Sequence, residues 1–147
     1  MNCNETFFDV ITAIEAYPFS GVSTTRTMQV HTKHVSESDL GVSESEKKDV
    51  PMKPKSCSLS EKSSVEIPGD SYKVTVSWNI KFVDSSTYTV LESLKEYPNH
   101  LILRTYDKGA YFIRCEENGY EFSYSEKDGE MECEATFHNK NGIQRIL

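Results

Sequence analysis

The sequence has no long hydrophobic run and no basic cluster. Nothing in it approaches the ~18 consecutive apolar residues of a membrane helix, and its opening residues lack the basic start and apolar stretch of an export signal. The formal net charge is -7, and no run of Lys and Arg could hold the phosphates of a nucleic acid. We therefore expect no membrane segment and no nucleic-acid partner, in a protein that works in a cytoplasm or is assembled there.

Cysteine is sparse and irregularly spaced. Cys3, Cys57, Cys115 and Cys133 form no C-x-x-C pair and no regular framework. The hairpins predicted below put Cys115 and Cys133 on strands separated by a third strand, too far apart for a disulfide. Two glutamates follow Cys115 and would disfavour its thiolate, so we interpret it as a strand residue rather than a nucleophile. Reduced thiols are the expected state.

Motifs of catalysis and ligand binding are also missing. The chain contains no G-x-S-x-G, no glycine-rich phosphate loop and no H-E-x-x-H. His31 and His34 lack the further ligands that a metal site needs, and Glu116 and Glu117 would point to opposite sides of a strand. We expect no enzyme activity, no cofactor, no metal and no small-molecule substrate.

The N-terminal region contains an apolar stretch whose period is ambiguous. The spacing of a helix fits Phe7, Val10, Ile11 and Ile14. The alternation of a strand fits Phe8, Val10, Thr12 and Ile14. The β-branched residues favour a strand over residues 7–16, with Pro18 and Gly21 forming a turn after it. A second strand is predicted over residues 24–32.

Residues 35–71 are dominated by Ser, Glu, Lys and Pro. Such a segment buries too little apolar surface to offset its ordering entropy, which predicts a solvated, mobile loop. The alternative is an arm that becomes ordered on a neighbouring protein. Its anchors would be its scattered apolar residues, with Leu40, Val42, Met52 and Leu59 as candidate partner contacts alongside Val50, Val65 and Ile67.

Residues 72–82, YKVTVSWNIKF, alternate large apolar and polar side chains, which is typical of a strand with one buried face. Trp78 lies in the middle of the apolar face and is predicted to belong to the core. Ser85 and Ser86 then offer N-caps for a short helix over about residues 86–97, which Pro98 ends. Its apolar side is predicted to comprise Tyr88, Leu91, Leu94 and Tyr97.

Four strand-like runs follow, and turn residues separate them. The turns are predicted at 107–109, 118–119, 127–129 and 139–142, where Asn-Gly and Asp-Gly pairs are strong hairpin signals. Four successive hairpins predict an antiparallel meander. In residues 130–137 the alternation turns Glu130, Glu132 and Glu134 outward, opposite Glu121, Ser123 and Ser125. This acidic row is either a plain solvated face or a contact for a basic partner.

These patterns predict a single domain over residues 1–147 of mainly β (α+β) class. The expected architecture is an antiparallel β-sandwich or small barrel, with one short flanking helix at about 86–97 and a long polar loop at about 35–71. The high aromatic content, with eight Tyr and seven Phe, favours the β-rich body.

The run WNIKFVDSSTYTVLESLKEYPNHLILRTYDKGAYFIR, with EENGYEFSYSEKDGEMECEATFHNKNGIQRIL after it, resembles small tail or neck proteins of tailed bacteriophages. The shared feature is the layout: an alternating strand, a short helix, and a hairpin-rich sheet that ends in an N-x-x-G turn. This resemblance covers about the last half of the chain. It implies a non-catalytic subunit of a ring or tube, with a long loop reaching the next subunit.

The expected function is therefore a structural subunit of a virion. Its partners would be other structural proteins and further copies of itself, in a virion assembled in the host cytoplasm. The alternative is a small acidic inhibitor or immunity-type protein that binds one basic partner.

Overall fold

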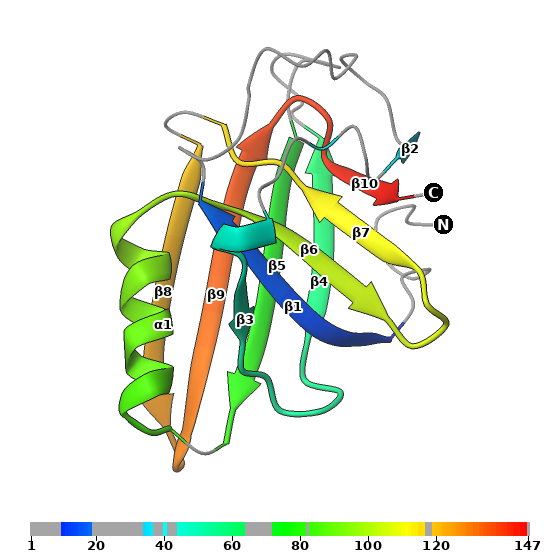
Figure 1. Cartoon of the computed structure of the whole chain (residues 1–147). Helices are drawn as coiled ribbons and strands as arrows, with labels where there is room; N and C mark the ends of the chain where they lie inside the picture. Colours follow the sequence, from blue (N-terminus) through cyan, green and yellow to red (C-terminus); the bar gives the residue numbers. More distant parts are fainter. Residues whose placement is uncertain are drawn as a thin grey trace.

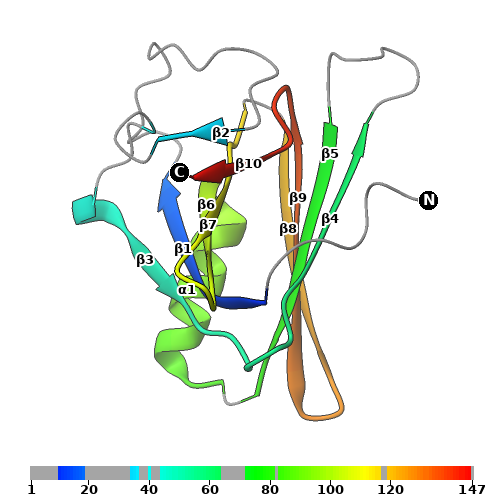
Figure 2. The same cartoon turned by 90° about the vertical axis from the view of Figure 1, so that its right-hand side faces the viewer.

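The computed structural model describes residues 10–18, 34–36, 40, 44–63, 72–81, 83–116 and 119–146. Their strands form two sheets that pack face to face, which Figure 2 shows edge-on as separate layers. The fold is mainly β with one short helix and is sandwich-like rather than a closed barrel, so the predicted class is confirmed.

One sheet has six strands and the other has four (Figure 1). The six-stranded sheet contains β1 (Ile11–Pro18), β2 (His34–Val35), β3 (Lys48–Val50), β6 (Asn99–Thr105), β7 (Ala110–Ile113) and β10 (Ile143–Ile146). Its order is β2-β10-β7-β6-β1-β3. The four-stranded sheet contains β4 (Ser58–Ser63), β5 (Tyr72–Ile80), β8 (Tyr120–Lys127) and β9 (Glu130–Asn139), in the order β4-β5-β9-β8. The helix is α1 (Ser85–Glu96), and a single 3-10 turn, η3, covers Glu44–Glu46.

The main core lies between the two sheets and is organised around Trp78. This side chain is 1% exposed, and its ring stacks on that of Phe122 with 5.9 Å between centroids. Every second residue of β5 and β9 points into the same core, as the alternation predicted; Phe82 lies outside the described residues. The buried members are Val74, Val76, Trp78 and Ile80 from β5, and Met131, Cys133, Ala135 and Phe137 from β9.

Helix α1 begins one residue earlier than predicted and has a different cap. Asp84, not Ser85 or Ser86, is the N-cap, because its Oδ1 accepts hydrogen bonds from the Thr87 amide at 2.9 Å and the Ser86 hydroxyl at 2.8 Å. These hydrogen bonds also lower the pKa of the Asp84 carboxyl. The helix ends at Glu96, ahead of Pro98 as predicted.

The buried side of α1 is narrower than the sequence suggested. Thr87, Leu91 and Leu94 are buried, whereas Tyr88 and Tyr97 are 42% and 56% exposed. The helix runs along β8 (Figure 1) and also contacts β3, so it covers one open side of the sandwich. The side chains of Thr87, Leu91 and Leu94 pack the helix onto the sandwich, and the two tyrosines at its margins remain partly in solvent.

The predicted meander is wrong at two of its four turns. The β6–β7 and β8–β9 hairpins form, with positive φ at Lys108, Asp128 and Gly129. The 118–119 turn instead leads from β7 in the six-stranded sheet to β8 in the four-stranded sheet, and the 139–142 turn leads back to β10. A Cβ at Gly119 would lie 2.3 Å from the His138 carbonyl oxygen, so this glycine permits a close backbone approach rather than a hairpin turn.

This crossing also places Cys115, just after β7, and Cys133, in β9, on different sheets, instead of in one sheet with a strand between them. The three cysteines in the described part of the chain are free thiols, as expected. Burial raises the pKa of Cys57, Cys115 and Cys133 to about 12. These thiols are therefore protonated at neutral pH and poor nucleophiles.

The polar segment is not the continuous loop that its composition predicted. Within its described residues 44–63, β3 pairs with β1 and β4 pairs with β5, so the segment adds an edge strand to each sheet. Edge strands tolerate polar sequences because much of their surface stays in solvent. At the N-terminus β1 confirms a strand from Ile11 onward, while residues 7–9 and 24–32 lie outside the described residues.

A second apolar cluster covers the other face of the six-stranded sheet. It consists of Tyr17, Val35, Leu40, Ile102, Ala110 and Phe112. His100 is buried beside it, stacked on Phe112, and its Nδ1 accepts the Cys115 amide at 2.8 Å. Burial, assisted by the positive charge of Arg114, lowers the pKa of His100 to about 3. His100 is therefore a neutral, structural histidine.

Replacing Trp78 with Ala should destabilise the protein by about 3–5 kcal/mol, because a large buried side chain is removed. Trp78→Phe is the matched control and should lose much less, since an aromatic ring remains against Phe122. Chemical denaturation followed by far-UV circular dichroism measures both. A near-neutral effect of Trp78→Ala would mean that this face of β5 is not the core.

Stability should also fall between pH 7 and pH 5. The folded-state pKa of His100 is about 3 against an ordinary histidine value of 6.5, so below pH 6.5 the unfolded chain takes up a proton that the folded protein excludes. The slope approaches about 1.4 kcal/mol per pH unit, or about 2 kcal/mol by pH 5. His100→Gln should flatten this slope, because it removes the buried imidazole. Equal slopes for the wild type and His100→Gln would contradict the assignment.

Candidate binding face

The side of the four-stranded sheet that faces away from the core is polar. We call it the polar face and define it by the residues that alternate with the core residues on its three longest strands. Its middle comprises Thr75, Ser77 and Asn79 on β5, Glu132, Glu134 and Thr136 on β9, and Glu121, Ser123 and Ser125 on β8; towards its ends the same alternation adds Lys73, Lys127, Glu130 and His138. The alternation rule alone placed the β8 and β9 residues here, and the structure confirms that orientation.

Glu132 and Glu134 lie at the centre of the polar face, and both are exposed. In the strand register Glu134 stands between Ser77 and Ser123, and Glu132 stands between Asn79 and Ser125. Neither carboxylate therefore has a lysine or arginine directly opposite on a neighbouring strand. Directly opposite pairs therefore do not neutralise these two carboxylates, and the cation nearest in register is Lys127, diagonal to Glu132 on β8.

An open depression of about 370 Å³ lies over Glu132 and Glu134 and over the residues opposite them on β5 and β8. Its polar lining combines two carboxylates with hydroxyl and amide groups from β5 and β8. These groups are Ser77, Asn79, Ser123, Ser125, Glu132 and Glu134. Such a lining accepts hydrogen bonds from a cationic or amide-bearing group.

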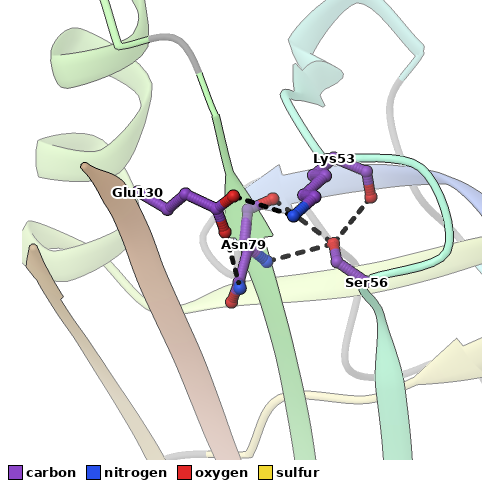
Figure 3. Close-up of polar contacts among 4 residues, drawn as sticks. All are labelled: Lys53, Ser56, Asn79 and Glu130. Atoms are coloured by element: carbon purple, nitrogen blue, oxygen red, sulfur yellow. Dashed lines mark hydrogen bonds and ion pairs between the residues drawn. The ribbon is translucent and has the colours of Figure 1, made fainter. Parts of the chain in front are cut away.

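Glu130 differs from the other two glutamates, although the sequence grouped it with them. Its carboxylate accepts hydrogen bonds from the Lys53 ammonium at 2.8 Å and the Asn79 side-chain amide at 3.1 Å (Figure 3). These two hydrogen bonds lower the pKa of the Glu130 carboxyl. Lys127 also stands opposite it in the register. The negative charge of Glu130 is thus neutralised within this chain, so Glu130 does not offer a free carboxylate to a partner.

Lys53 reaches Glu130 because a tight loop between β3 and β4 is bonded to β5 (Figure 3). The Lys53 amide donates to the Asn79 carbonyl at 2.7 Å, and the Asn79 amide donates to the Ser56 hydroxyl at 3.1 Å. The loop therefore extends the backbone pairing of β5 at one end of the polar face. Nothing in the sequence around Lys53 signals this contact, because its partners are distant along the chain.

The apolar residues proposed as partner contacts are mostly used inside the protein. Leu40 is 0% exposed in the second apolar cluster. Met52 and Leu59 are half-buried against the main core. Val42 lies outside the described residues. The physical reason is that residues 35–71 contain β3 and β4. The few apolar side chains of this segment pack these strands against the rest of the sandwich.

Groups for metal chemistry are not gathered in the described part of the chain. No set of three or more His, Cys, Asp or Glu residues there could hold a metal ion. His34 is exposed on β2, and His31 lies outside the described residues. None of the described helices is long and apolar enough to cross a membrane.

No protein-family model matches the chain. Searches of curated protein sequences and of solved structures also find no match. The polar face, with its open depression over Glu132 and Glu134, is an exposed feature of the described residues that suits binding. Arg114 was not singled out by the sequence, although an arginine within the apolar run AYFIRC is a usable signal.

Proposed function

We propose that the chain is a non-enzymatic binding protein that acts as a structural subunit of a bacteriophage tail or neck assembly. The observation that carries the binding role is the pair Glu132 and Glu134, exposed on β9 with no cation opposite them in the strand register. The assembly role is supported by the layout of the second half of the chain, which resembles small tail and neck proteins.

A neighbouring protein with exposed Lys or Arg suits the polar face. Complementary charge steers association and sets the orientation of the partners, while the hydroxyls of Ser77 and Ser123 can complete the hydrogen bonds. Because β9 is a central strand, with β5 and β8 on its two sides, the carboxylates are held on a rigid support. Little ordering entropy is then lost when a partner binds.

Strand edges offer a second kind of contact, to further copies of the same chain. In the part of the four-stranded sheet that the structure describes, β4 and β8 stand at the two ends of the strand order. Each therefore has one edge that pairs with no other described strand. Strand edges are common sites of association between subunits, which supports a homo-oligomer such as a ring.

The alternative function is a free acidic inhibitor or immunity-type protein. The same exposed carboxylates support it, because an acidic surface binds a basic enzyme with strong dependence on ionic strength. The two functions differ in where the chain is found. A subunit remains in purified particles, whereas an inhibitor forms a soluble complex with one partner.

The test is recovery of the chain from purified phage particles by quantitative mass spectrometry. Wild-type protein should be present in stoichiometric amounts, and the double variant Glu132→Lys with Glu134→Lys should be reduced at least ~10-fold, since two unfavourable charge contacts replace favourable ones. The matched control, Glu96→Lys with Glu126→Lys, makes the same change in net charge at exposed positions outside the polar face and should be retained.

Absence of the wild-type chain from particles would contradict the assembly role. A soluble one-to-one complex that dissociates with salt would then favour the inhibitor. Equal recovery of the face variant and its control would instead show that the polar face is not the contact surface.

A further inference from the structure

Arg114 is a buried arginine with two unpaired nitrogen atoms. It follows β7 and is 8% exposed, and its Nε and Nη2 are buried with no hydrogen-bond acceptor in the part of the chain that the structure describes. These two nitrogens form one edge of the planar guanidinium group. This is the edge that binds a carboxylate through two parallel hydrogen bonds.

The surroundings of Arg114 compensate its charge only in part. The guanidinium lies over the Phe112 ring, 5.4 Å from the ring centroid, which is a favourable cation–π contact. The nearby Glu116 carboxylate favours the charged form, but burial outweighs it and lowers the pKa of Arg114. Glu116 instead accepts the Lys140 amide at 2.7 Å. A buried charge without hydrogen-bond partners is unfavourable, so this edge is chemically incomplete.

The groups around Arg114 also restrict which anion fits. His100 stands next to it at the end of the β6–β7 pair, and its Nδ1 is occupied by the Cys115 amide, so the proton of the neutral ring is on Nε2. The local charge is therefore that of one guanidinium, with Glu116 nearby. The Nε and Nη2 edge matches the two oxygens of one carboxylate, and Glu116 repels such a monoanion less than it would repel a phosphate dianion.

We propose that the Nε and Nη2 edge of Arg114 is a binding site for a carboxylate group. The site lies at the end of β7, which belongs to the six-stranded sheet rather than to the sheet that carries the polar face. The ligand enters by displacing the side chains that cover this edge. The carboxylate belongs either to a small organic acid or to a partner chain, and the chemistry is the same for both.

The direct test is an NMR titration of the Arg114 Nε–H signal in the full-length protein at pH 7. Sodium acetate replaces sodium chloride at constant ionic strength. The signal should shift and saturate with acetate, while the Nε–H signal of Arg145, an exposed arginine, should move little. Weak binding through a single group is still visible at about 0.2 M ligand. The proposal would therefore be overturned if the Arg114 signal did not shift at this concentration of acetate. A shift with phosphate but not acetate would overturn the carboxylate assignment.

Short peptides distinguish the two sources of the carboxylate. Triglycine with a free C-terminus should shift the Arg114 signal, and the same peptide with an amidated C-terminus should not. A stronger response to the free peptide than to acetate assigns the site to a partner chain, and the reverse assigns it to a small acid. Equal responses to both peptides would contradict recognition of the carboxylate.

Thermal unfolding provides an independent readout. If acetate binds with a Kd of about 10 mM, 100 mM acetate should raise the Tm of the wild type by about 3–6 °C relative to chloride. Arg114→Met should abolish this shift, and Arg145→Met should retain it. Arg114→Lys should lose most of it, because an ammonium group cannot make the paired contact. An equal shift in the wild type and Arg114→Met would overturn the proposal.

Discussion

The register of β9 between β5 and β8 is the constraint on which the structure depends. With Glu134 opposite Ser77 and Ser123, the neighbouring Cys133 and Ala135 point into the core. A slip by one residue would turn the glutamates inward and the apolar side chains outward. Burying unpaired carboxylates is strongly unfavourable, so the core and the polar face follow from the same choice of register. The proposed function therefore depends on the packing around Trp78.

Local periodicity was enough to predict much of this arrangement. The faces of β5, β8 and β9 follow from their period of two, and the β6–β7 and β8–β9 hairpins follow from their turn residues. The meander failed because a turn signal shows where the chain reverses but not which sheet the next strand joins. Gly119 and the 139–142 turn carry the chain between sheets, and that choice depends on how both sheets share one core.

The candidate site also contains residues that the sequence could place and residues that it could not. Glu132 and Glu134 could be placed from the alternation of β9 alone. Glu130 could not be separated from them, because its partner Lys53 is 77 residues away in the chain. The strands β3 and β4 of the polar segment were not predicted, because edge strands need few apolar residues. The apolar run around Arg114 indicates that it could be buried, but only the structure shows that its Nε and Nη2 have no acceptor among the described residues.

The most direct measurement is the set of cross-strand NOE contacts of Glu134 in the folded protein. The account predicts contacts from its backbone to those of Ser77 on one side and Ser123 on the other. Both contacts together would establish the register that exposes the acidic pair and buries the core. Contacts of Ser77 and Ser123 with Cys133 or Ala135 in place of Glu134 would mean a shifted register, and would contradict both the core and the polar face.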